Sequence, residues 1–104
     1  MKYNKLVRDK IPEIIEKKDG IKPVVHFADD AELWTKLKEK LMEEAREFSE
    51  ANPEQELGEL ADISEVIDAI MRFKRISVLK LDRAKDKKRQ ERGGFKDKII
   101  LDEA

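Results

Sequence analysis

Carboxylates stand in this sequence at positions where two predicted helices should carry apolar side chains. The first helix is expected to begin after an Asp29 cap and to end near Ala51, with an apolar stripe about 80° wide. Glu44 lies inside that stripe, while Glu47 lies roughly 60° and Glu43 roughly 100° to one side of Glu44. Only Glu44 is therefore predicted to point clearly inward. The stripe consists of Leu33, Leu37, Leu41 and Phe48.

The second predicted helix shows the same anomaly. It should start at an Asn52 cap followed by Pro53, and it should end near residue 74 or 75. Its apolar arc spans about 140° and includes Glu56 and Glu59, and Asp62 lies near the edge of that arc. An arc this wide exceeds what one antiparallel neighbour covers, which favours association with another copy. The arc contains Leu60, Ile63, Val66, Ile67, Ile70 and Met71.

These acidic residues together indicate a metal site. The short linker predicts that the two helices are antiparallel, which would bring Glu44 and Glu47 opposite Glu59 and Asp62. Carboxylates that face one another in a buried place repel unless a cation neutralises them, and only Lys40 offers a nearby basic partner. A set of oxygen ligands suits Mg²⁺ or Mn²⁺, and Mg²⁺ usually completes its coordination with water and substrate phosphates.

Two simpler interpretations stay open on these residues alone. Each glutamate taken singly could be an ordinary solvated side chain, because acidic residues are common on helix surfaces. The acids could also form a structural metal site or salt bridges between subunits. Paired acids on the apolar side of two consecutive helices favour a functional cation site over solvated glutamates.

Two further helices are predicted around this pair. A short helix should carry Pro12 in its first turn, where the missing N–H group has no intrahelical partner. Ser77 should cap a third, strongly charged helix that ends before Gly93 and Gly94. The expected fold class is therefore all-α, with the paired long helices as an antiparallel hairpin.

A small two-stranded sheet is also expected. Residues 24–27 are rich in β-branched and aromatic side chains, and we predict that they pair with the apolar run in the tail FKDKIILDEA. His26 in this segment is interpreted as a packed or surface histidine rather than a metal ligand. Trp34 is interpreted as a core or dimer contact.

Composition limits the class of protein further. The 104 residues are expected to form one domain, 1–104, whose core would be modest without association. Although 45% of the residues are charged, 23 Lys and Arg nearly balance 24 Asp and Glu, so nothing favours a nucleic acid or anionic membrane partner. The chain has no cysteine and no apolar run near the roughly 20 residues that cross a bilayer. We expect a cytoplasmic protein.

The acidic residues also form a recognisable signature. EExxE at Glu43, Glu44 and Glu47, followed by ExxD at Glu59 and Asp62, resembles the signature of the all-α nucleoside triphosphate pyrophosphohydrolases. The opening NKLVRDKIPEII and the closing ERGGF resemble the MazG-like, phosphoribosyl-ATP pyrophosphohydrolase-like proteins of the predicted house-cleaning branch. The resemblance spans nearly the whole chain. One departure is the gap of 11 residues between Glu47 and Glu59, which is shorter than in many relatives.

The resemblance implies a Mg²⁺-dependent enzyme that hydrolyses a nucleoside triphosphate to monophosphate and pyrophosphate. It implies that Glu44, Glu47, Glu59 and Asp62 are metal ligands and that Glu43 and Glu44 are the catalytic residues. Glu43 would be a further ligand or would orient the attacking water. It also implies a homodimer or homotetramer in which the paired helices form a four-helix bundle.

Substrate phosphates need cations, and the motif segments supply candidates. Lys5 and Arg8 lie in the opening motif, and Lys88 and Arg92 lie near the closing one. Two other functions are kept as alternatives: a non-catalytic helical interaction module, and a regulator that binds nucleotide without turnover. The preferred base and sugar of the substrate cannot be predicted from this sequence.

Overall fold

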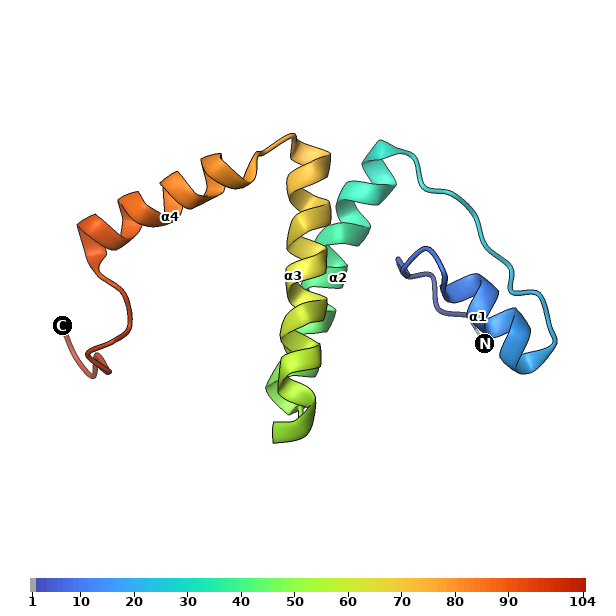
Figure 1. Ribbon diagram of the computed structural model, residues 1–104, viewed down its shortest axis with the longest axis horizontal. Coiled ribbons are helices and arrows are strands. Elements are labelled where there is room, and N and C mark those ends of the chain that lie inside the picture. Colours follow the sequence, from blue (N-terminus) through green and yellow to red (C-terminus); the bar gives the residue numbers. More distant parts are fainter. Residues whose placement is uncertain (1) are drawn as a thin grey trace.

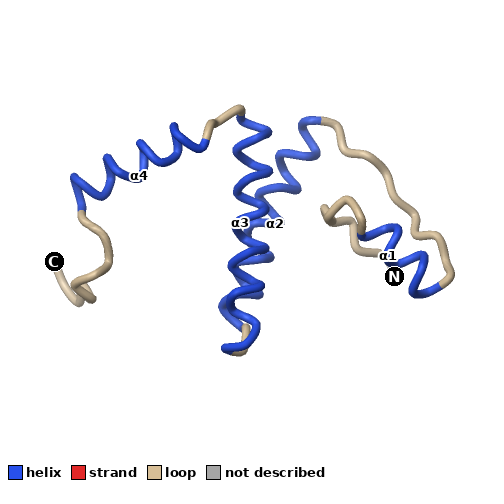
Figure 2. Tube along the Cα trace, viewed as in Figure 1, coloured by secondary structure: helices blue, strands red, loops and turns tan. Residues whose placement is uncertain are grey.

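The computed structural model describes residues 2–104 and contains four α-helices, with no strand in that range (Figure 2). The all-α prediction is therefore confirmed. None of the helices in the described range combines the length and apolar character needed to span a membrane. The helices are α1 (Ile11–Asp19), α2 (Asp30–Glu50), α3 (Glu56–Lys74) and α4 (Val78–Arg92), and a short 3-10 helix, η1 (Pro53–Gln55), joins α2 to α3.

Helices α2 and α4 begin directly after their predicted capping residues, whereas Asn52 caps the short helix η1 and α3 begins only at Glu56. The side chain of Asp29 accepts a 2.9 Å hydrogen bond from the Glu32 backbone at the start of α2. The Ser77 hydroxyl accepts a 3.1 Å bond from the backbone of Lys80 at the start of α4. These bonds satisfy N–H groups that the first helical turn leaves without partners. The predicted starts of the first long helix, α2, and of the charged helix after Ser77, α4, are confirmed.

Helices α2 and α3 lie side by side and run antiparallel (Figure 1). Their contact forms the core, in which the buried hydrophobic side chains of the described residues are Leu37 from α2 and Val66 and Met71 from α3. Near the α4 end of this hairpin, the rings of Trp34 and Phe73 stack with centroids 5.4 Å apart. Trp34 is thus a half-buried hairpin contact, as the core interpretation predicted.

The outer segments leave the hairpin on opposite sides. Helix α1 lies to one side and α4 extends to the other, and the C-terminus continues beyond α4 (Figure 1). Every residue of α4 is exposed except Leu81, which is half-buried. Among the described residues, the buried side chains therefore all lie in the hairpin.

The predicted two-stranded sheet is wrong. Residues 24–27 are irregular and exposed, and so are Ile99 to Leu101 in the tail. Paired strands must lie about 4.8 Å apart, but these two segments lie on opposite sides of the hairpin (Figure 1). His26 is a surface residue whose Nε2 atom lies 2.9 Å from a carboxylate oxygen of Glu32.

Candidate metal centre

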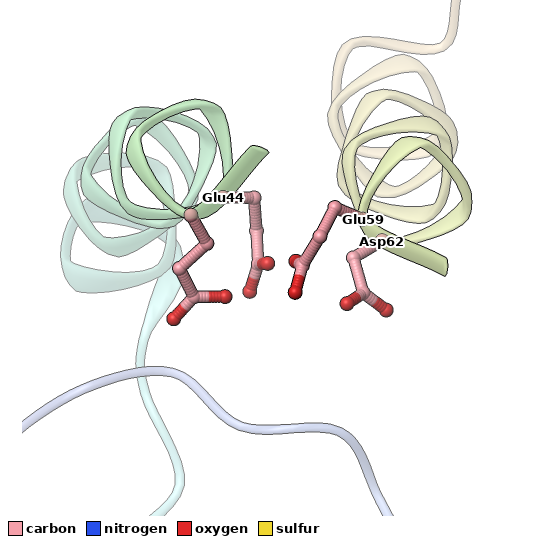
Figure 3. Close-up of side chains that lie close together, drawn as sticks. Glu44, Glu59 and Asp62 are labelled. Atoms are coloured by element: carbon pink, nitrogen blue, oxygen red, sulfur yellow. The ribbon is translucent and has the colours of Figure 1, made fainter. Parts of the chain in front are cut away.

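Four carboxylates from the two hairpin helices converge on one place. Each of them offers an oxygen atom, and these oxygens all lie within 4.8 Å of one another. Figure 3 shows the side chains of both helices pointing in the same direction toward this shared place. A spacing of three residues puts each pair on one helix face, and the antiparallel hairpin sets the two faces together. The residues are Glu44 and Glu47 from α2, and Glu59 and Asp62 from α3.

Burial separates these acids from ordinary surface glutamates. Glu44 is only 6% exposed, as its inward position in the sequence predicted, while Glu59 and Asp62 are half-buried and Glu47 is exposed. The Oε2 atoms of Glu44 and Glu59 are buried and have no hydrogen-bond partner within residues 2–104. A buried polar atom without a partner costs about 1–3 kcal/mol, and more when it is charged. The site therefore contains acceptor atoms that a cation would satisfy.

The electrostatics of Glu44 agree with this description. Burial raises the pKa of Glu44 above the ordinary glutamate value, and the neighbouring carboxylate of Glu47 raises this pKa further. The ammonium of Lys40, with Nζ at 3.4 Å from Glu44 Oε1, opposes the rise without cancelling it. Four carboxylates in the metal-free cluster thus face two cations, Lys40 beside Glu44 and Arg8 beside Asp62.

Glu43 faces lysines rather than the cluster. Its two oxygens accept bonds from Lys40 at 3.1 Å and from Lys5 at 3.2 Å. Partial burial acts to raise the pKa of Glu43, but the two lysines outweigh that effect and lower it. Burial likewise acts to lower the pKa of Lys40, but the hydrogen bonds and negative charges of Glu43 and Glu44 together outweigh burial, so this pKa is raised. Glu43 lies outside the set of four converging carboxylates.

The N-terminal segment, residues 2–10, brings two of the predicted cations to the site. Arg8 donates from Nη2 to Asp62 Oδ1 at 2.8 Å, and Lys5 reaches Glu43 as described above. The segment is also held by Lys36, whose Nζ donates to the carbonyl oxygen of Asn4 at 2.9 Å. In Figure 3 a stretch in the pale blue of the N-terminus crosses the view on the side toward which the carboxylates point.

Lys88 and Arg92 are not brought to the four carboxylates. Both are exposed on α4, which extends away from the hairpin (Figure 1), and neither forms an ion pair with any residue in the described range. Glu56 does not occupy the inward position that the helical angles predicted for it. It is exposed because it begins α3 at the turn of the hairpin, beyond the last residue of α2.

Sequence reasoning missed Lys36. This residue lies on α2 one helical turn before Lys40, and its side chain is 19% exposed. The spacing of four residues between the two lysines was the available signal, because it places both on one helix face. The contact of Lys36 with Asn4 in the N-terminal segment depends on how residues 32 positions apart meet, and helical spacing carries no information about that.

Comparisons with family models, with curated proteins and with solved structures each gave no match to this chain. Any function of this chain must therefore be inferred from the chemistry of the site itself. Its oxygen ligand atoms come from four acidic side chains, and two buried carboxylate oxygens have no hydrogen-bond partner in the described part of the chain. This donor set can hold a metal cation.

Proposed function

We propose that this chain is a Mg²⁺-dependent nucleoside triphosphate pyrophosphohydrolase of the MazG-like type. It would act in house-cleaning of the cytoplasmic nucleotide pool, with standard, deoxy and damaged triphosphates all open as substrates. The observation that carries the proposal is the convergence of four carboxylates within 4.8 Å, with two buried oxygens to which no described residue donates a hydrogen bond. The same four residues occupy the motif positions on which the family resemblance depends. The spatial convergence of the carboxylates and the resemblance of the sequence motifs thus both support the same site.

The cation would be held by Glu44, Glu47, Glu59 and Asp62. We propose Mg²⁺, with Mn²⁺ as a substitute, because both ions prefer oxygen ligands and Mg²⁺ often binds substrate phosphates as well. Such a cation, when bound, polarises phosphoryl oxygens and lowers the pKa of bound water. In this assignment Glu43 holds Lys5 and Lys40 in place instead of serving as a ligand.

Two cations of the N-terminal segment are proposed to bind substrate phosphates. Arg8 and Lys5 already lie at the rim of the site, paired with Asp62 and Glu43. A guanidinium can donate two parallel hydrogen bonds to a phosphate, as it does to a carboxylate. Lys88 and Arg92 enter the proposal only through α4 of a second copy, since α4 extends away from its own hairpin.

The proposed reaction needs no side-chain nucleophile. Water forms a bond to the α phosphorus while the bond from that phosphorus to the bridging oxygen breaks, and the proton of the water passes to solvent. Monophosphate and pyrophosphate are the products. Arg8 and Lys5 are placed to stabilise negative charge on the phosphate groups during this step.

A panel of nucleoside triphosphates, assayed for pyrophosphate release with Mg²⁺, tests the proposal. Loss of a residue that hydrogen-bonds to a metal ligand typically lowers activity roughly 10- to 100-fold. Glu59 is proposed to be a ligand itself, so Glu59→Gln should lower the rate with the best substrate by at least that factor. Glu56→Gln is the matched control, because it makes the same change on the same helix at an exposed position outside the cluster. It should retain the wild-type rate.

Absence of pyrophosphate with every substrate would refute the enzymatic proposal, and so would equal rates in the two variants. Titration of nucleotide with and without Mg²⁺ separates enzyme from regulator. Tight Mg²⁺-dependent binding without any product would assign the chain to the regulators instead.

We also propose that the protein is a homodimer or homotetramer built on a four-helix bundle of α2 and α3. The support is apolar surface that one copy leaves uncovered on α3, including Leu57 at 80% exposed and Leu60 at 48% exposed. One copy buries few hydrophobic side chains, so a second copy would enlarge the core. Light scattering coupled to size-exclusion chromatography should give two or four times the 12.2 kDa chain mass. A monomer would contradict this.

A further inference from the structure

A small cavity adjoins the metal site between the N-terminal segment and α2. Its volume is about 40 Å³, whereas a site for one water needs only about 10–15 Å³. It can therefore accommodate a group larger than a single water molecule. The lining residues are Lys5, Leu6, Lys36, Glu39, Lys40 and Glu43.

Three of the six lining side chains are lysines, and they come from two separate segments of the chain. Lys36 and Lys40 project from adjacent turns of α2 with 19% and 17% of their side chains exposed, and Lys5 comes from the N-terminal segment. Partly buried ammonium groups need acceptors, and two glutamates in the lining supply some of them. Three positive charges against two negative charges leave the cavity with an excess of one positive charge.

Lys40 joins this cavity to the metal site. Its Nζ lies 3.1 Å from Glu43 in the cavity lining and 3.4 Å from Glu44 in the acidic cluster. The acidic cluster favours a cation, while the adjoining cavity favours an anion. A ligand that carries a chain of phosphates meets both conditions, because its phosphates bind a cation and also accept hydrogen bonds from ammonium groups.

We propose that this lysine cavity is a binding subsite for a phosphoryl group, with Lys36 as a ligand-binding residue. The inference rests on the proposed function in one respect: it takes the group to be the pyrophosphate end of the triphosphate substrate. On binding, phosphate oxygens replace Glu39 as the acceptor for Lys36, which now lies 3.2 Å from that carboxylate. Glu39 is thus a competitor of the ligand.

The competition gives two variants opposite expected effects. Titration calorimetry of the full chain with inorganic pyrophosphate, in saturating Mg²⁺, measures both. Lys36→Gln should weaken pyrophosphate binding roughly tenfold, because it removes a hydrogen bond between charged groups. Glu39→Gln should strengthen binding, since Lys36 loses its internal acceptor. Lys87→Gln is the control for net charge, because Lys87 is exposed on α4 and forms no ion pair within residues 2–104.

The subsite proposal would be overturned if Lys36→Gln and Lys87→Gln weakened pyrophosphate binding equally. It would also be overturned if Glu39→Gln bound pyrophosphate more weakly than the wild type. Circular dichroism establishes whether each variant is folded. If Lys36→Gln does not fold, the pyrophosphate affinity of Glu39→Gln alone tests the subsite. Mg²⁺ titration without pyrophosphate separates the two proposals. Intact Mg²⁺ binding with no pyrophosphate binding refutes the subsite alone, whereas pyrophosphate binding by a chain that hydrolyses no triphosphate refutes the enzyme and leaves the subsite standing.

Discussion

The α2–α3 hairpin and helix α4 are both highly charged helical regions, yet they differ in nearly every structural respect. The hairpin buries side chains along its length and gathers four carboxylates at one place. Helix α4 carries seven basic and three acidic residues, and almost all of its surface is exposed (Figure 1). Charge content therefore does not distinguish the two regions.

The distribution of apolar residues explains the difference. In the hairpin they recur at helical spacing over many turns, so burial of one face is favourable and acids on that face are carried inward. In α4 the large apolar residues Val78, Leu79 and Leu81 are confined to the first turn. The remaining turns have no apolar stripe with which to pack. An acid becomes chemically unusual in this chain only when a packed stripe holds it away from water.

The largest contrast should appear on truncation of apolar side chains. Leu37→Ala in the hairpin core should lower the free energy of unfolding by about 2–5 kcal/mol, because Leu37 is 2% exposed and its loss leaves a cavity. Leu79→Ala on α4 should change it by less than about 0.5 kcal/mol. Urea denaturation followed by circular dichroism measures both. A large effect of Leu79→Ala would reveal that α4 packs against another copy.

Removal of divalent cation should affect the hairpin strongly. At a Mg²⁺ concentration 100-fold above its dissociation constant, binding should stabilise the fold by about 2.7 kcal/mol, and a chelator should abolish this gain. Asp62→Asn should lose much of the gain, whereas Asp68→Asn, an exposed acid on the same helix, should keep it. Thermal melting with Mg²⁺ and with chelator tests this. An equal gain in both variants would place the cation elsewhere.

A smaller effect should follow from the pKa of Glu44. The folded protein binds this proton more tightly than the unfolded chain, because burial and Glu47 raise the pKa. Glu44 thus stabilises the metal-free fold most below the ordinary glutamate pKa of about 4.3, and this contribution is lost as the pH rises through the raised pKa.

Glu44→Gln should therefore stabilise the metal-free protein above that pKa while removing its response to Mg²⁺. Melting temperatures in chelator, from about pH 4 to about pH 8, measure the first effect. Glu91→Gln makes the same change on exposed α4 and should leave the profile unaltered. A metal-free Glu44→Gln protein less stable than wild type at the upper pH would show that the carboxylates do not repel one another.

The smallest effect is expected at the ion pair of α4. Arg89 lies 3.1 Å from Asp86, and both side chains are more than 60% exposed. Exposed pairs of this kind contribute only about 0.3–0.5 kcal/mol, so Arg89→Ala should barely change the free energy of unfolding. Urea denaturation at low and at high salt checks this. A loss well above 1 kcal/mol would mean that Arg89 contacts another molecule.

Several features of the fold follow from sequence because they are local. Asp29 and Ser77 cap helices through hydrogen bonds to groups only three residues away. The inward direction of Glu44 follows from its angle within a stripe on its own helix. The same reasoning failed for Glu56, because position within a helix does not reveal where the partner helix ends.

Other features were decided only when distant segments met. The contacts of Lys5 with Glu43 and of Arg8 with Asp62 join residues 38 and 54 positions apart, and they set the N-terminal segment beside the acids. The prediction of a two-stranded sheet was wrong because it also depended on distant segments. Strand-forming residues at 24–27 cannot by themselves bring a distant partner strand close. By itself the sequence determined which faces of the helices are apolar and which acids lie on them. The tertiary structure decided which of those acids share a place, because side chains on separate helices meet only through the packing of the hairpin.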